Sequence, residues 1–555
     1  MVARGLAVAR KLSPSLADYR GLEKTWRVDV VAGVTVGIVA LPLALAFGVS
    51  SGAGAEAGLI TAIIAGVIGA VFGGSNVQVS GPTGAMVVVL APIIALYGTA
   101  VLPMLCLMAG VIVLLAGILR LGRTVSYIPW PVIEGFTLGI AIIIFFQQVP
   151  TATGTAVGES TNALLAAVQS LTTVTWPKLG WSLAIVAVVV LIMVLAPRAH
   201  PRFPGSLVAI VVAALAVHLL DLPVDTIGEL PAGLPAPVLP TADLPMLSVL
   251  LGPAIAVAAL AAIESLLSAR VAASMADTGA YDADRELVGQ GLASIGAAFF
   301  GGMPATGAIA RTAVNVRAGA RTRVASITHG VLLLLIVLVG AAVVSRIPLA
   351  ALAGVLMVTA FRMVNLRTVR TVVGATRSDA IVFVITALVT VSVDLIYAVL
   401  IGIAVAAFFA LRQLARASGV HRDELPGAVE AGDERIALFR LEGSLFFGAA
   451  ERMLERVGSL RDIEVVIIRM SQLQLIDATG AQVVTEMITA LERRGITVLV
   501  KGIQPRHLQL AARVGVLRAL RHKKHLFDEL EPAVEHARSH VRRAAAATSG
   551  TTSWR

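Results

Sequence analysis

Apolar segments separated by short polar loops occupy most of the chain before residue 412. Several reach the ~20 residues that a helix needs to cross a bilayer core, and the shorter ones suggest half-helices. This pattern predicts an α-helical membrane domain, interrupted by a polar, threonine-rich stretch at 150–178. Fourteen transmembrane elements are expected, at 30–49, 57–72, 79–97, 101–121, 128–149, 181–196, 205–220, 247–269, 286–300, 304–315, 324–344, 348–361, 380–393 and 395–411.

Two parts of this membrane domain repeat the same order of residues. GAVFGG at 69–74 is followed by SGPTGAM at 80–86, and GAAFFGG at 296–302 is followed by MPATGAI at 303–309. With about seven elements in each half, the second copy enters the membrane from the opposite side, which predicts a 7+7 inverted repeat. In such repeats, paired segments interrupted by glycine and proline point to the binding site. The alternative is that these glycines and prolines only help the membrane helices to pack against one another.

The second copy is predicted to form a half-helix at 304–315, broken at membrane depth. A broken helix is tolerated there only where it is buried in protein or lines a cavity. The N–H groups and the dipoles of two facing helix ends would attract an anion. Arg311 adds a permanent cation, unless it is the structural partner of a carboxylate such as Glu264. The residues expected at the two helix ends are Thr83, Gly84 and Ala85, and Thr306, Gly307 and Ala308.

Glu264 lies in an otherwise apolar helix, with Ser268 one turn away on the same face. A carboxylate there can carry a proton, or it can neutralise Arg311 when the site is empty. The alternative is a carboxylate that packs helices through a backbone hydrogen bond. Glu134 and Asp394 also lie near apolar runs, and a structural role is favoured for both.

The charge pattern gives the orientation of the membrane domain. The chain has 555 residues, of which 57% are hydrophobic and 14% charged, and its net charge is +10. Lysine and arginine lie in alternate short loops, which is the positive-inside pattern of an inner (plasma) membrane protein with both termini cytoplasmic. The net charge therefore requires no nucleic-acid partner. The N-terminus has no expected signal-peptide cleavage site.

Sites for enzyme chemistry, cofactors or metals are not expected. The single cysteine, Cys106, excludes disulfides within one chain and cysteine-based metal sites. There is no Walker-type motif for ATP-driven transport. His522 and His525 flank Lys523 and Lys524, which favours a solvated basic surface over a metal site.

The composition becomes that of a soluble domain near residue 430. Strands are expected at 436–441, 463–470 and 496–502, and helices at 449–457, 480–494 and 505–512. This alternation predicts a small cytoplasmic α/β domain. The expected divisions are an N-terminal segment 1–28, a transport domain 29–414, a linker 415–433, the α/β domain 434–540 and a disordered tail 541–555.

Several motifs resemble the sulfate permease (SulP) family of anion transporters. They are ALPLALAFGVSSGAGAEAGL at 40–59, FGGSNVQVSGPTGAM at 72–86, and GGMPATGAIARTAVNVRAGART at 301–322. LIDATGAQVV at 475–484 resembles the STAS domain that ends these proteins. The resemblance implies seven plus seven helices divided into core and gate domains, an elevator-like movement of the core, and homodimers. It places the site between helices one, three, eight and ten.

Carried over residue by residue, the resemblance puts Thr83, Glu264 and Arg311 at the site, with Leu43 and Phe47 lining it. Many sulfate-transporting relatives have glutamine where this chain has Leu43, and the first helix looks closer to the bicarbonate-carrying branch. Part of that branch couples to sodium through an aspartate at the position of Glu264 and a threonine at that of Ser268. Glutamate together with Arg311 makes sodium the less favoured coupling ion and leaves proton coupling or exchange open.

The function implied is secondary active transport of a small inorganic anion, bicarbonate or sulfate, with proton coupling or exchange left open and no cofactor. The alternatives are a dicarboxylate carrier, an uncoupled anion channel, and an anion-sensing membrane regulator that signals to a cytoplasmic protein through the STAS domain. A nucleobase permease is disfavoured because Arg311 calls for a negative ligand. Phosphorylation of Thr479 is a further hypothesis, because a phosphate at a helix start is electrostatically favourable; an ordinary N-cap is the alternative.

Overall fold

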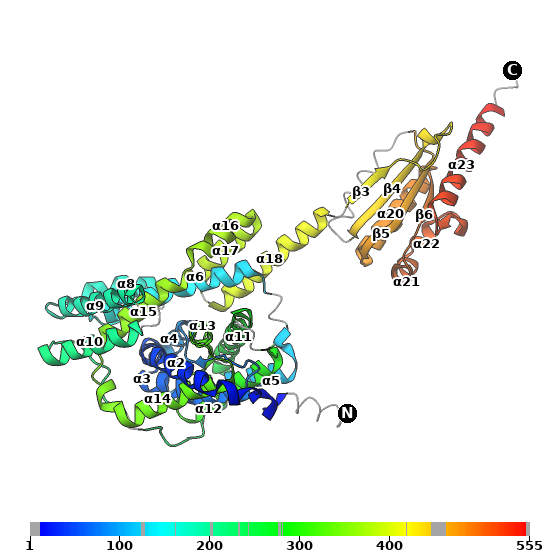
Figure 1. Cartoon of the computed structure of the whole chain (residues 1–555). Coiled ribbons are helices and arrows are strands. Elements are labelled where there is room, and N and C mark those ends of the chain that lie inside the picture. Colours follow the sequence, from blue (N-terminus) through cyan, green and yellow to red (C-terminus); the bar gives the residue numbers. More distant parts are fainter. Residues whose placement is uncertain are drawn as a thin grey trace. The chain divides into compact units, whose positions relative to one another are not determined.

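The chain divides into two compact units, Met1–Ala404 and Val405–Arg555. The first is helical and the second contains a sheet (Figure 1). The division falls within helix α18 (Leu395–Ala417), so the expected boundary at 414 lies inside a continuous helix. The computed structural model describes residues 12–123, 128–160, 162–199, 204–230, 233–241, 243–275, 279, 281–393, 395–417, 419–445 and 462–550.

One group of helices in the first unit holds the two glycine-interrupted segments. Within it α12 packs against α3 and α5, while α14 packs against α2 and α3. Close crossing depends on small residues: a Cβ on Gly58 of α3 would lie 2.1 Å from the carbonyl oxygen of Ala44 on α2. The members are α2 (Leu22–Ser50), α3 (Ala55–Phe72), α4 (Gly84–Tyr97), α5 (Leu102–Ile118), α11 (Leu244–Met275), α12 (Ala283–Phe299), α13 (Ile309–Arg317) and α14 (Arg323–Val344).

A second group of helices packs beside the first (Figure 1). Within it α6 packs against α17, and α9 packs against α15 and α10. Contacts between α15 and α2, and between α6 and α4, join the two groups. The members are α6 (Trp130–Gln147), α7 (Val149–Thr153), α8 (Ala163–Ser170), α9 (Lys178–Ala199), α10 (Gly205–Leu220), α15 (Leu349–Met363), α16 (Leu366–Ala375), α17 (Arg377–Ser392) and α18.

The surfaces of these helices suit a lipid environment. Nine helices in the described part of the chain are long and apolar enough to span a membrane. Large apolar side chains such as Leu191, Leu215 and Val339 are exposed on their outer faces. Because helices satisfy their own backbone hydrogen bonds, such faces can lie against hydrocarbon. The expectation of a helical membrane domain is confirmed.

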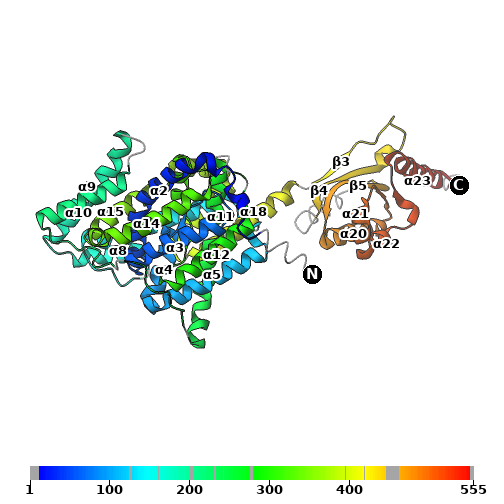
Figure 2. The same cartoon turned by 60° about the horizontal axis from the view of Figure 1, so that its bottom comes forward.

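The second unit is an α/β domain built on a five-stranded sheet of order β3-β4-β5-β6-β7. Strand β3 is antiparallel to β4, and the other neighbours are parallel. Helices α20, α21 and α22 gather along the sheet (Figure 2) and pack on one of its faces, while α23 covers the other. The elements are β3 (Gly419–Asp423), β4 (Ile436–Leu445), β5 (Val465–Ile476), α20 (Ala478–Arg493), β6 (Thr497–Lys501), α21 (Pro505–Val514), α22 (Val516–Ala519), β7 (Leu526–Phe527) and α23 (Leu530–Gly550).

Three expectations for this unit differ from the structure or fall outside it. Strand β3 lies in the segment 415–433, which was expected to be only a linker. Helix α23 extends to Gly550, so residues 541–550 of the expected disordered tail are helical. The apolar stripe Ala533, Val534, Ala537 and Val541 fixes this helix against β4 and β5. The helix expected at 449–457 lies outside the described residues.

Candidate anion-binding site

The two glycine-interrupted segments meet as a small antiparallel sheet. Strand β1 (Ser80–Gly81) pairs with β2 (Thr306–Gly307), with Ser80 opposite Gly307. The pairing brings the starts of α4 and α13 together inside the first group of helices, next to α3 and α11. The expected meeting of the two repeat copies is therefore confirmed by the backbone hydrogen bonds between them.

The second half-helix begins later than expected. Helix α13 starts at Ile309, so the prediction of a helix from 304 and of Thr306 at its start is wrong. The reason is competition for the backbone N–H groups. The N–H of Gly307 donates to Ser265 Oγ (3.0 Å), and that of Ala308 donates to the carbonyl oxygen of Val79 (2.8 Å). These two groups are already paired and do not face an anion.

The first half-helix is α4, and its first N–H groups have no acceptor within the helix. Thr83 is the N-cap of α4, and its hydroxyl accepts the N–H of Met86 (3.4 Å). Gly84 and Ala85 are the first residues of the helix, so their N–H groups have no intrahelical acceptor. The helix start that the sequence predicts at Thr83, Gly84 and Ala85 is therefore present, and its role as an anion site stays a prediction.

Apolar side chains close over the start of α4. A Cβ on Gly84 would lie 2.3 Å from Ile144 Cδ1 and 3.4 Å from Phe47 Cε1. Phe47 therefore lies beside the helix end, as expected, and Leu43 is buried one turn earlier on α2. Ile144 belongs to α6 of the second group, so the site lies where that group meets the first.

Arg311 reaches the first repeat copy from the first turn of α13. Its side chain is 2% exposed, and its Nη2 donates to the carbonyl oxygen of Pro82, immediately before Thr83. Its Nη1 is buried and finds no acceptor among the described residues. Gly81 makes room for the guanidinium, because a Cβ there would lie 2.7 Å from Nη1. A buried cationic donor without a partner is costly, and an anion would satisfy it.

Glu264 is bound to Thr83 and makes no close ion pair with Arg311. The Thr83 hydroxyl donates to Glu264 Oε2 (2.7 Å), and the Thr306 hydroxyl lies beside the same carboxylate. No ion pair shorter than 4.0 Å joins Glu264 to Arg311, although the two charges act on each other at longer range. The two side chains therefore flank the start of α4 separately.

Ser268 is tied to the second repeat copy. Its hydroxyl donates to Thr312 Oγ1 (3.1 Å), which also accepts the N–H of Val79 (3.0 Å). These contacts fasten α11 and α13 to the strand β1 side of the site. Within α6 the indole N–H of Trp130 donates to Glu134 Oε1 (3.0 Å), which agrees with the structural role favoured for Glu134. Asp394 lies outside the described residues.

The family follows from the sequence comparisons. The profile of the sulfate permease family matches residues 26–386, and that of the STAS domain matches residues 430–533. A putative sulfate transporter of Bacillus subtilis, YvdB, is 34% identical over 515 residues, covering 90% of this chain and 96% of the relative. The chain belongs to the SulP family. It is an anion transporter of the membrane, with a C-terminal STAS domain, and not an enzyme.

Other SulP relatives and solved structures agree with this assignment. The bicarbonate transporter BicA of Synechocystis is 29% identical over 502 residues, covering 85% of this chain and 88% of the relative. The structure of a cyanobacterial BicA transmembrane domain matches with a TM-score of 0.61 and 32% identity, over 69% of this chain and 97% of that one. The structure of SLC26A9 matches with a TM-score of 0.83 over 97% of this chain and 94% of that one; at 17% identity it supports the fold alone.

The first group of helices also holds buried polar residues that the sequence reasoning missed. His329 of α14 is fully buried, and neither ring nitrogen has a partner in the described structure. Glu286 accepts the N–H groups of Gly74 and Ser75 (2.8 and 3.1 Å) and so holds the loop before β1. A histidine inside an apolar segment was available as a signal, because ionisable residues in such segments are rare.

Thr479 lies at the start of α20 in the STAS domain. The N-cap of this helix is Asp477, whose carboxylate accepts the N–H of Gly480 (2.7 Å). Thr479 is therefore not the N-cap, and that alternative is wrong. Its side chain is exposed in the first turn, where a phosphate would meet the positive end of the helix dipole. Phosphorylation of Thr479 stays a prediction.

Proposed function

We propose that this SulP protein is a secondary active carrier of bicarbonate or sulfate in the plasma (inner) membrane. The proposal rests on the Nη1 atom of Arg311, which is buried and has no acceptor among the described residues. This atom lies next to Gly81, close to the N-terminus of α4. An oxyanion with two or more oxygens can accept from this guanidinium and from the N–H groups of Gly84 and Ala85. Arginine suits oxyanions because its rigid fork of donors can bind two oxygens of one anion.

The polar donors of the site fit either anion, because Arg311 and the N–H groups of Gly84 and Ala85 can bind the oxygens of both. The relatives named above are described as a sulfate transporter and as bicarbonate transporters, at 34% and 29% identity. Leu43 and Phe47 leave the first helix with apolar lining, and this favours the anion that is cheaper to desolvate, which is the singly charged bicarbonate. A dicarboxylate carrier is the second candidate, because a carboxylate group offers Arg311 the same pair of oxygens.

The carrier would work by movement of the first group of helices, the core, against the second, the gate. Thr83, Glu264 and Arg311 all belong to the core, whereas the gate contributes Ile144 to the lining. Helix contacts support a 7+7 inverted repeat. In that assignment the contact between α12 and α5 corresponds to the contact between α3 and α14. The contact between α6 and α17 corresponds in the same way to the contact between α15 and α9. A rigid core that carries its site past the gate is the elevator-like mechanism.

Glu264 is the proposed proton carrier. It is held by the Thr83 hydroxyl rather than by Arg311, so its charge is not cancelled by a close ion pair. Protons are therefore the preferred coupling ion. We also infer a homodimer with both termini cytoplasmic and a STAS domain that binds a cytoplasmic protein.

Uptake into liposomes tests this function. Purified protein is reconstituted, and labelled bicarbonate, sulfate or a dicarboxylate is added outside, with or without a proton or sodium gradient. Saturable uptake driven by the proton gradient is expected. Flux that does not saturate would favour a channel, and anion binding without any flux would favour a membrane sensor. Arg311→Gln should abolish uptake, while Arg317→Gln, on the exposed side of the same helix, serves as the matched control.

A further inference from the structure

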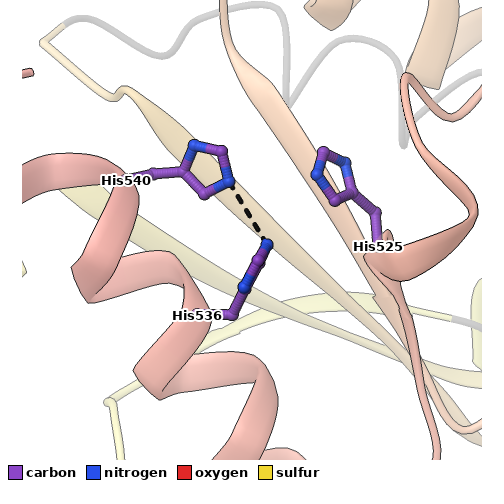
Figure 3. Close-up of side chains that lie close together, drawn as sticks. All are labelled: His525, His536 and His540. Carbon is purple, nitrogen blue, oxygen red and sulfur yellow. Dashed lines mark hydrogen bonds between the residues drawn. The ribbon is translucent and has the colours of Figure 1, made fainter. Parts of the chain in front are cut away.

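Three histidines of the STAS domain converge from two elements. His525 ends the 3₁₀ helix η6 (Lys523–His525), and His536 and His540 lie one turn apart on α23 (Figure 3). One ring nitrogen from each of the three lies within 4.8 Å of the others. His525 is 2% exposed, and its Nδ1 finds no partner among the described residues. The expectation of a solvated surface at His525 is therefore wrong.

The spacing of the ring nitrogens fits a tetrahedral ion. The Nε2 atoms of His536 and His540 are 3.3 Å apart and face each other (Figure 3). Two imidazole nitrogens bound to Zn²⁺ at about 2.0–2.1 Å with tetrahedral angles would be about 3.3 Å apart. Histidines four residues apart on one helix face are also a known zinc-ligand spacing. His525 approaches from the opposite side (Figure 3), so one of its ring nitrogens is placed to be a third ligand.

The protonation state of the cluster favours metal binding. Burial lowers the pKa of His525 to about 4, and the neighbouring His540 and His536 add to the shift. Burial also lowers the pKa of His536 and His540, with the charge of Arg543 as the next cause for both. All three imidazoles are therefore neutral at neutral pH and keep a lone pair for an ion.

The charged side chains around the cluster affect how well it would hold a metal dication. Arg521, Arg543 and Lys524 act on these histidines, and no carboxylate belongs to the group of three. A bound dication would therefore be less well compensated than in a site with thiolate or carboxylate ligands. Its fourth position would take water or an anion, since His536 and His540 are only half-buried. The structural alternative is a packed cluster of neutral rings joined by the His536–His540 hydrogen bond.

We propose that His525, His536 and His540 bind a divalent transition-metal ion, with Zn²⁺ as the preferred class, and that the ion fastens α23 to the segment before β7. Imidazole ligands suit Zn²⁺, Cu²⁺ and Ni²⁺. Because α23 covers one face of the STAS sheet, occupancy would control how firmly that helix is held. The proposal does not depend on which anion the membrane domain carries.

The test uses the full chain in detergent micelles, with any polyhistidine tag removed and metals stripped by a chelator. Zn²⁺ is added, and bound metal is counted by mass spectrometry after gel filtration. Affinity comes from competition with a chromogenic chelator. One Zn²⁺ per chain with micromolar or tighter affinity is expected. Co²⁺ should give the visible absorption of a tetrahedral site, and hydrogen exchange in α23 should slow when metal is bound.

Two variants and a control decide the assignment. His536→Asn and His540→Asn should each weaken Zn²⁺ binding at least ~10-fold, about 1.4 kcal/mol. His421→Asn, an exposed histidine of the same domain, should leave it unchanged. Equal Zn²⁺ affinity in all four proteins, or less than one weakly bound ion in the wild type, would overturn the proposal. If a variant fails to fold, the Co²⁺ spectrum of the wild type still decides, because absorption without tetrahedral character would also overturn it.

Discussion

Replacing Arg311 by alanine removes its contact within the protein and its proposed contact with the cargo, and measurements of stability and of anion binding tell the two apart. Nη2 bonds the Pro82 carbonyl oxygen, and Nη1 has no protein acceptor within the described structure. A hydrogen bond that involves a charged group contributes about 1.5–3 kcal/mol. Losing the Nη1 bond to an anion should therefore weaken binding by roughly 10- to 150-fold. Losing the Nη2 bond should lower the thermal stability of the empty protein.

Arg311→Lys tests the same contacts with the positive charge kept. A lysine keeps the charge but is a compact point donor on a flexible stem, so it cannot hold the Pro82 carbonyl and an anion as a rigid fork does. We expect the affinity of the lysine variant to lie between those of the wild type and Arg311→Ala. Binding is measured by calorimetry with bicarbonate and sulfate on protein in lipid nanodiscs, and stability by thermal unfolding without anion. Arg317→Ala, at an exposed position on α13, is the matched control.

One result would refute the role of Arg311 as a ligand. If Arg311→Ala lowers thermal stability but leaves anion affinity within about twofold of the wild type, a difference of about 0.4 kcal/mol, the arginine only anchors α13 to Pro82, between β1 and α4. The anion would then depend on the N-terminus of α4 alone. A loss of affinity without a loss of stability would instead show that the Pro82 contact contributes little to folding.

Three further predictions use other parts of the chain. Glu264→Gln keeps a side-chain oxygen for the Thr83 hydroxyl but carries no proton, so uptake should lose its pH dependence; an unchanged pH profile would place coupling elsewhere. Gly58→Ala puts a Cβ 2.1 Å from a backbone oxygen of α2 and should destabilise the fold by about 1–3 kcal/mol or more in thermal unfolding, whereas Gly252→Ala, with open space, should not. Burial lowers the pKa of His525 to about 4, so the folded protein favours the neutral ring. The stability that the neutral ring contributes is present above the unfolded pKa of about 6.5 and is lost as the pH falls towards 4. Hydrogen exchange in α23 of the metal-free protein should show this loss, and His525→Asn should remove it.

The sequence predicted the membrane segments because their signal is local. A run of apolar residues and a positive loop are visible without knowledge of the partner helices. The repeat also indicated that the two segments lie together, since similar interrupted motifs in two halves of a membrane protein imply a shared site. In the structure Ser80 pairs with Gly307, and Arg311 donates to the carbonyl oxygen of Pro82.

The errors arose where a distant partner decides the local structure. Thr306 and Gly307 look like a helix start, but pairing with Ser80 and Gly81 makes them a strand. The histidine cluster was missed for the same reason. His525 was weighed with its sequence neighbours, whereas its spatial neighbours lie on α23, in the region expected to end the domain. No pattern within a few residues of either site records those long-range contacts.

The separation of Glu264 from Arg311 bears on what the core can carry across the membrane. Moving net charge through a low-dielectric environment is costly, so a mobile core favours neutral states. The empty core is neutral when Glu264 is ionised beside Arg311, and the core loaded with a singly charged anion is neutral only when Glu264 is protonated. One proton would then accompany each bicarbonate, and flux would not depend on membrane potential. Sulfate adds a second negative charge, so its transport with one proton should respond to potential. A potential-dependent bicarbonate flux would contradict this account of coupling.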